Sequence, residues 1–249
     1  MPTSRHERAL RREGFRAIAG VDEAGRGALF GPVFAAAVVL DPDRPIRGLD
    51  DSKQLEPDRR EVLAERIRER ARAWAVAAAD AFEIDRVNIL QASRLAMRRA
   101  VERLLVNRLQ NEVCPGRGDS SAASGAGPAV CGLPGGCDYL LVDAVTVDVA
   151  LPQKALIHGD ALCFSIAAAS ILAKVHRDHA LNAWDRVFPE YGLGHNKGYS
   201  TPDHVAALEK FGPTSLHRFS FEPVRLSSKI QVWTGYPSVV RQGELFACL

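Results

Sequence analysis

Short apolar runs alternate along the chain with longer stretches whose apolar residues recur at helical spacing. The short runs are rich in Ala, Val, Leu and Ile and predict buried strands at 15–21, 33–40, 74–81, 139–144 and 154–158. The longer stretches predict helices at 57–71, 84–105 and 165–184. Strands that alternate with helices in this way favour an α/β layer fold, and the central sheet need not be wholly parallel.

The composition is that of a globular protein with one large core. Of 249 residues, 47% are hydrophobic and 25% are charged, which is enough for a single domain with additions. The chain has no apolar signal region and no unbroken run of ~18 apolar residues, so we expect a cytoplasmic protein without a membrane contact. Five cysteines without a CxxC pair indicate reduced thiols. The net charge of +2 means that any nucleic-acid-binding surface must be local.

Three aspartates follow predicted buried strands. Asp22 ends the first, Asp143 follows the run "YLLV", and Asp160 follows "ALIHG". Sites in α/β sheets are assembled at strand ends, and carboxylates gathered there are costly unless a cation holds them ionised. Carboxylates without His or Cys favour Mg²⁺ or Mn²⁺ over Zn²⁺. A pair of such ions suits phosphodiester hydrolysis, since one activates water and the other stabilises the leaving oxygen.

A specific resemblance is carried by motifs in a fixed order. The segments are "AGVDEAGRGALFGPV", "DDSKQL", "LLVDA", "HGDALCFSIAAASILAKVHRD", "HNKGYSTPDH" and "HRFSFEPV". Together they resemble bacterial ribonuclease HII, of the type 2 ribonuclease H family, over roughly 15–224. The resemblance implies an RNase H-like fold, with a mixed central sheet flanked by helices and a helical C-terminal part. It also implies an endonuclease that hydrolyses RNA in RNA–DNA hybrids and cuts 5′ of ribonucleotides embedded in duplex DNA, leaving 3′-hydroxyl and 5′-phosphate ends.

The same resemblance assigns roles to particular residues. It implies that two divalent ions, Mg²⁺ or Mn²⁺, are bound by the catalytic acids Asp22, Glu23, Asp143 and Asp160. It implies that the backbone of Gly25, Arg26 and Gly27 reads the ribose 2′-hydroxyl, while Tyr199 packs on the neighbouring sugar. Phosphate contacts are expected from Lys53, Lys174, Arg177 and Lys197. Asp178 lies on a predicted helix, where we expect it to pair with a nearby Arg instead of a metal.

Two segments lie outside the resemblance. The stretch at about 112–137 is Gly, Ser, Ala and Pro without periodicity, which predicts a flexible surface insertion. We therefore expect an N-terminal extension (1–14), a catalytic domain (15–225) and a C-terminal tail (226–249). The expected substrates are an RNA–DNA hybrid and ribonucleotide-containing duplex DNA, bound by a monomer. A protein partner could dock on the tail through Trp233 and Tyr236.

Two other functions fit parts of the sequence. A ribonuclease HIII-like hybrid nuclease is disfavoured by the Arg between the glycines of "DEAGRG" and because no extra N-terminal domain precedes the motif. A non-catalytic module that binds hybrids is disfavoured by the four acids, because a binding protein gains nothing from mutually repelling carboxylates.

Overall fold

A mixed sheet forms the centre of the computed structural model, which describes residues 2–113 and 136–233. Its strand order is β3-β2-β1-β4-β5. The long strands β1 (Ile18–Ala24), β2 (Val33–Val39) and β3 (Ala73–Ala79) pair antiparallel in succession. On its other side, β1 runs parallel to β4 (Tyr139–Asp143), which runs parallel to β5 (Gln153–Leu156). The parallel strands end at one edge of the sheet, where functional groups can gather.

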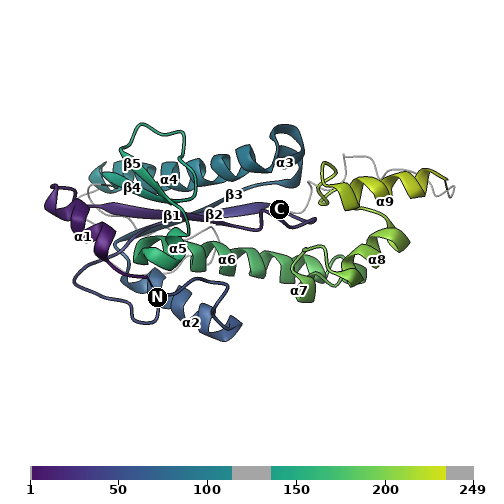
Figure 1. The fold of residues 1–249 in the computed structure, drawn as a ribbon, viewed down its shortest axis with the longest axis horizontal. Helices are drawn as coiled ribbons and strands as arrows, with labels where there is room; N and C mark the ends of the chain where they lie inside the picture. Colours follow the sequence, from purple (N-terminus) through teal and green to yellow (C-terminus); the bar gives the residue numbers. More distant parts are fainter. Residues whose placement is uncertain (1, 114–135, 234–249) are drawn as a thin grey trace.

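Helices cover both faces of this sheet (Figure 1). In chain order they are α1 (Arg5–Arg12), α2 (Pro57–Arg70), α3 (Ala81–Val87), α4 (Ile89–Val113), α5 (Gly159–Leu162), α6 (Phe164–Asp185), the 3₁₀ turn η1 (Pro189–Tyr191), α7 (Leu193–Asn196), α8 (Pro202–Phe211) and α9 (Glu222–Trp233). The helix α4 packs on one face and α6 on the other, with α2 against α6. The helices α8 and α9 extend away from the sheet.

The alternation along β2 shows why both faces are covered. Ala35 and Ala37 face the cluster around α4, whereas Ala36 and Val38 face the cluster around α6. All four are fully buried, so the strand presents small apolar side chains in both directions.

On β1 the contact with α6 is closer still. A Cβ atom built on Gly20 would lie 2.0 Å from the carbonyl carbon of Ser165. The backbones of β1 and α6 therefore touch directly at this point.

The predicted strands are present, whereas one predicted helix is divided. The expected helix at 84–105 is two helices, because Asn88 adopts φ 69° between α3 and α4. With ψ 163° this is an extended positive-φ conformation that residues other than Gly seldom adopt. The Asn88 side-chain oxygen accepts a hydrogen bond from the Gln91 amide (3.1 Å), which supports the start of α4. The apolar spacing continues across the break, so the sequence pattern alone does not reveal it.

Helices lie near both ends of the described part of the chain. The expected extension 1–14 contains α1, which packs on the domain through the buried residues Glu7 and Leu10. The Ser165 amide at the start of α6 donates to the Glu7 carboxylate (3.0 Å). The helix α9 crosses the boundary expected at residue 225, and most of the expected insertion at 112–137 lies outside the described residues. No helix in the described part of the chain is long and apolar enough to cross a membrane.

The contact at Gly20 gives a direct test of the packing. Gly20→Ala should lower the free energy of unfolding by about 3 kcal/mol, because a methyl group cannot enter the space held by the α6 backbone. Gly27→Ala is the matched control, since no neighbouring atom lies within 4 Å of its Cβ position. Denaturant unfolding of both variants measures the difference, and equal stability of the two would contradict the close packing.

Candidate active site

The four acids lie at the ends of adjacent elements. Val21 of β1 is in register with Val142 of β4, so Asp22 and Asp143 are the next positions along two parallel strands. Glu23 follows Asp22 on β1. Asp160 lies in α5, directly after β5, which is the next parallel strand. The sheet topology thus brings together acids that are more than a hundred residues apart in sequence.

Hydrogen bonds hold these side chains only in part. Oδ1 of Asp143 accepts from the Gly159 amide (2.7 Å), which ties the end of β4 to the first residue of α5. Oε1 of Glu23 pairs with the Arg26 guanidinium at 3.1 Å. The other oxygen, Oε2, is buried and has no hydrogen-bond partner among the described residues. One acidic oxygen of the site is therefore left without a stabilising contact.

Burial and mutual repulsion raise the pKa of three of the acids. The pKa of Asp22 is raised well above its ordinary value by burial and then by Glu23, Asp143 and Asp160. Burial also raises the pKa of Glu23, against the opposing effect of Arg26. The pKa of Asp160 is raised by burial, Asp51 and Asp143. The protein alone thus disfavours the ionised form of this cluster.

The donor set fits a hard divalent cation. It contains only carboxylates, one of whose buried oxygens lacks a partner, and a cation would reverse the raised pKa values. No group of three or more His, Cys, Asp or Glu side chains in the described part of the chain is already arranged to hold an ion. The chemistry of the residues therefore fits a metal, while their side chains would have to close around it.

The glycine loop that follows these acids rests on a buried arginine. Gly25 has φ +96°, and a Cβ built on it would lie 2.1 Å from Nε of Arg177. The Arg177 guanidinium donates to the Lys197 carbonyl (2.8 Å) and lies 5.2 Å from the ring centroid of Tyr199. The Tyr199 side chain remains partly exposed. Arg177 therefore lies between the loop and Tyr199 and supports both.

The position of Arg177 corrects the expected phosphate contact. The residue is fully buried (0% exposed), so no part of its side chain is available to a substrate in this structure. Arginine side chains are seldom fully buried, and here the contact with Gly25 and the bond to the Lys197 carbonyl keep Arg177 inside.

The three expected lysines lie in different surroundings. Lys53 is exposed, and its Nζ lies 4.0 Å from Oδ2 of Asp160. Although burial opposes it, the surrounding aspartates, Asp51 first, raise the pKa of Lys53. Nζ of Lys197 donates to the side chain of Asn182. Lys174 donates to Asp178 (2.7 Å), so it is already engaged in an ion pair.

Asp178 is part of a structural cluster and not of the acidic site. Besides Lys174, it lies 3.8 Å from the guanidinium of Arg60 on α2. The arginine expected near Asp178 is therefore supplied by another helix, and the pair links α2 to α6.

Sequence reasoning missed one residue that contacts the loop. Arg218 is fully buried, and its guanidinium donates to the carbonyls of Arg26 (2.9 Å) and Gly31 (2.8 Å). Arg218 belongs to the quoted segment "HRFSFEPV", but nothing in that segment's spacing indicates which carbonyls it contacts.

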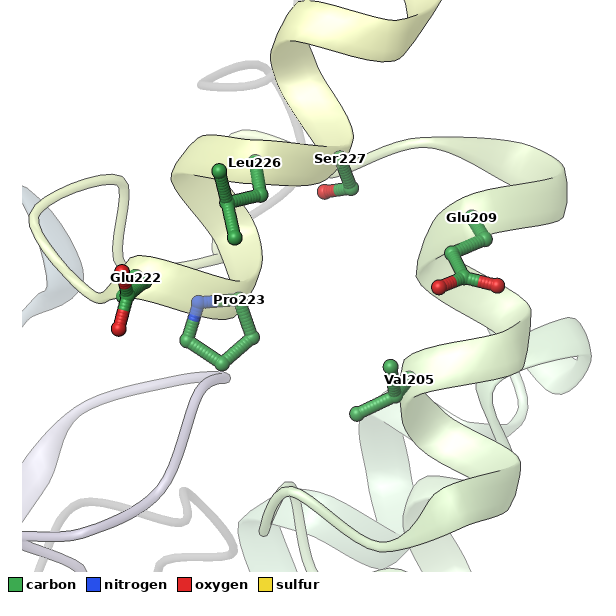
Figure 2. Close-up of a pocket in the computed structure, with 6 residues that line it drawn as sticks. All are labelled: Val205, Glu209, Glu222, Pro223, Leu226 and Ser227. Carbon is green, nitrogen blue, oxygen red and sulfur yellow. The ribbon is translucent and has the colours of Figure 1, made fainter.

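A separate pocket lies between α8 and α9 and shares no residue with this site (Figure 2). Its lining residues are Val205, Glu209, Glu222, Pro223, Leu226 and Ser227. This pocket is therefore not the candidate active site, which lies where β1 and β4 end and α5 begins.

Comparison of the sequence with a family model and with known relatives gives one family. A family model described as Ribonuclease HII matches residues 19–114 and 135–224. The ribonuclease HII of Solibacter usitatus (strain Ellin6076) is 59% identical over 223 residues, which cover 90% of this chain and 85% of the relative.

Solved structures share the fold. The ribonuclease H2 of Pyrococcus horikoshii OT3 matches with a TM-score of 0.60 and 23% identity, over 86% of this chain and 98% of that one. A chain of the PCNA:RNase HII complex from Archaeoglobus fulgidus matches with a TM-score of 0.61 and 24% identity, over 83% and 96%. The expected RNase H-like fold, with a mixed sheet and C-terminal helices, is confirmed.

The repulsion at Asp22 predicts a stabilising substitution. Because its folded-state pKa is raised, ionised Asp22 destabilises the metal-free protein above its unfolded-state pKa, and this cost disappears as pH falls toward ~4. Asp22→Asn should raise the melting temperature at pH 7 by about 2–4 °C for each kcal/mol of repulsion removed. The gain should shrink on acidification.

Asp178→Asn is the control with the opposite sign, because it breaks the pair with Lys174. It should lower the melting temperature. Thermal unfolding in a chelating buffer between pH 4 and 7 measures both variants. Destabilisation by Asp22→Asn at pH 7 would contradict the electrostatic description of the site.

Proposed function

The chain belongs to the ribonuclease HII family and is a type 2 ribonuclease H endonuclease; from this premise we propose that it hydrolyses RNA in RNA–DNA hybrids and cuts 5′ of ribonucleotides embedded in duplex DNA. The supporting observation is the gathering of Asp22, Glu23, Asp143 and Asp160 beside a glycine loop. A ribonuclease HIII-like activity has less support, because the 59% identical relative is a ribonuclease HII.

We propose that the four acids hold two divalent cations, Mg²⁺ or Mn²⁺. Bound there, the cations would activate the attacking water and stabilise the leaving oxygen, giving 3′-hydroxyl and 5′-phosphate ends. The unpartnered oxygen of Glu23 supplies a ligand without breaking an existing hydrogen bond. The bond from Gly159 holds one oxygen of Asp143, which fixes the direction of the other. Lys53, exposed beside Asp160, is positioned to meet a phosphate that approaches the acids.

We propose that the loop Gly25 to Gly27 and Tyr199 recognise the ribose. A 2′-hydroxyl both donates and accepts, so backbone groups can read it where the chain approaches the sugar closely. The space beside Gly27 is open, which leaves room for that approach. Tyr199, partly exposed above Arg177, offers a ring to the adjacent sugar. Lys197 would contact a phosphate only after leaving Asn182, and Lys174 only after leaving Asp178.

The assay of cleavage tests the catalytic assignment. Asp143→Asn should reduce cleavage at least about 100-fold. Loss of a residue that only hydrogen-bonds to a metal ligand can already cost that much, and Asp143 is proposed to bind the metal itself. Folding should be retained, because the Asn oxygen can still accept from Gly159. The substrates are a duplex with one ribonucleotide and an RNA–DNA hybrid, each with Mg²⁺ or Mn²⁺, and the product ends are mapped.

Asp148→Asn is the matched control, since this aspartate is exposed and lies on the connection between β4 and β5. It should cleave at the wild-type rate. Cleavage near that rate by Asp143→Asn would remove Asp143 from the catalytic set.

We also propose a protein partner for the C-terminal tail, residues 226–249. The Archaeoglobus fulgidus relative was solved in a PCNA:RNase HII complex. In this chain the sequence beyond α9 ends with the apolar residues Leu245, Phe246 and Leu249, and apolar side chains are what docking segments insert into grooves.

Removal of residues 234–249 should therefore abolish binding to the PCNA counterpart of the same organism while cleavage is unchanged. Titration calorimetry with the full and shortened chains measures binding. Equal affinity of the two chains would place the partner surface elsewhere.

A further inference from the structure

A short C-terminal segment connects the glycine loop with the region of Tyr199. Residues 216–218 run antiparallel to residues 29–31, which follow the loop directly, with a bridge between Phe30 and His217. The Arg218 amide donates to the Leu29 carbonyl (2.8 Å), and the Gly31 amide donates to the Leu216 carbonyl (2.9 Å). Residues 216–218 are therefore hydrogen-bonded to the residues that follow the glycine loop.

The Arg218 side chain extends this support into the loop itself. Its guanidinium spans the carbonyls of Arg26 and Gly31. Arg218 is fully buried, so in this structure its guanidinium donates to backbone carbonyls and is not exposed to solvent.

His217, the neighbour of Arg218, begins a second connection. The Thr214 amide donates to Nδ1 of His217 (2.9 Å), so that nitrogen is an acceptor and a neutral ring carries its proton on Nε2. Nε2 lies 3.2 Å from Nε2 of His204, which must accept. The proton of His204 is then on Nδ1, which donates to the Tyr199 carbonyl (2.9 Å). The chain of bonds fixes one tautomer for each ring.

The surroundings of the two histidines favour their neutral forms. Both are fully buried, and burial followed by the neighbouring His204 lowers the pKa of His217 to about 3. The rings of Phe30 and Tyr191 pack on His217 at 4.8 and 4.9 Å between centroids. The Tyr191 hydroxyl donates to the Gly212 carbonyl and takes no part in the chain of bonds.

We propose that His217 and Arg218 are positioning residues that couple the glycine loop to Tyr199 and so set the specificity for a single ribonucleotide. Arg218 holds the carbonyl of Arg26, and His217 holds the carbonyl of Tyr199 through His204. The inference rests on the proposed function, in which both elements contact the ribose. A single embedded ribonucleotide offers one 2′-hydroxyl, so both contacts must be in place together, whereas a long hybrid offers many binding registers.

The tautomers test the coupling without any substrate. Long-range ¹H–¹⁵N spectra of the labelled protein at neutral pH should show the proton of His217 on Nε2 and that of His204 on Nδ1. The reverse tautomers, or a protonated ring at neutral pH, would overturn the chain of bonds.

The proposed effect of the coupling on specificity is tested by a ratio of two rates, that of cleavage at a single embedded ribonucleotide and that of cleavage of a long hybrid. His217→Ala should lower this ratio about tenfold, as expected for the loss of one buried hydrogen bond. His217→Gln should restore most of it, because the Gln amide can still donate to His204. A loss of folded protein lowers both rates equally and leaves the ratio unchanged.

Tyr191→Phe is the matched control, since it removes a buried hydrogen bond from the same cluster but not from the coupling. It should leave the ratio unchanged. An unchanged ratio in folded His217→Ala would overturn the proposal, and so would a ratio in His217→Gln that is no higher than in His217→Ala. If His217→Ala does not fold, the tautomers of the unmodified protein decide, because the reverse tautomers would overturn the chain of bonds from His217 to the Tyr199 carbonyl.

Tyr199→Ala tests the proposed contact of the Tyr199 ring with the ribose separately from the coupling. The substitution removes the ring but keeps the backbone carbonyl that His204 contacts. It should lower the ratio, and adding His217→Ala should lower it little further. If Tyr199→Ala leaves the ratio unchanged, the proposed ribose reading itself is wrong. If it lowers the ratio and His217→Ala does not, only the coupling is wrong.

Discussion

The close contact between β1 and α6 is the constraint on which the rest of the site depends. Within β1, Gly20 has no side chain and so lets the Ser165 backbone come into contact. Just beyond the end of β1, Gly25 in the same way lets the Arg177 side chain come into contact. Five residues of strand span roughly 17 Å, and twelve residues of helix span roughly 18 Å. The two contacts are therefore almost the same distance apart along β1 as along α6. Both can form only when β1 and α6 keep this one alignment.

This alignment explains how one edge of the sheet combines two different tasks. The strand β1 carries Asp22 and Glu23 into the acidic cluster and then continues into the glycine loop. The helix α6 brings Arg177 under that loop, and Arg177 in turn contacts Tyr199 from the C-terminal part. The acids and the residues proposed to read the ribose are thus positioned by the same pair of elements, which links cleavage to recognition.

The sequence predicts most of the framework because its signals are local. Asp22, Asp143 and Asp160 are visible where apolar runs end, and strand ends are where α/β sheets gather their sites. Glu23, the loop glycines and Tyr199 were expected only through the family resemblance. The break at Asn88 escapes prediction because the apolar spacing continues through it, and one backbone angle decides it. The burial of Arg177 and the pairing of His204 with His217 escape prediction because they arise only from contacts between distant segments.

The buried carboxylate of Glu7 gives the first residues of the chain an importance that their place in the sequence conceals. It accepts from the Ser165 amide and from the thiol of Cys163, at the beginning of α6. The family match begins only at residue 19. A fragment cut to that boundary would leave donors at the start of α6 buried without an acceptor, and the disturbance would fall on the helix that aligns β1. The helix α1 therefore contributes to packing at the start of α6, although it precedes the residues that the family model matches.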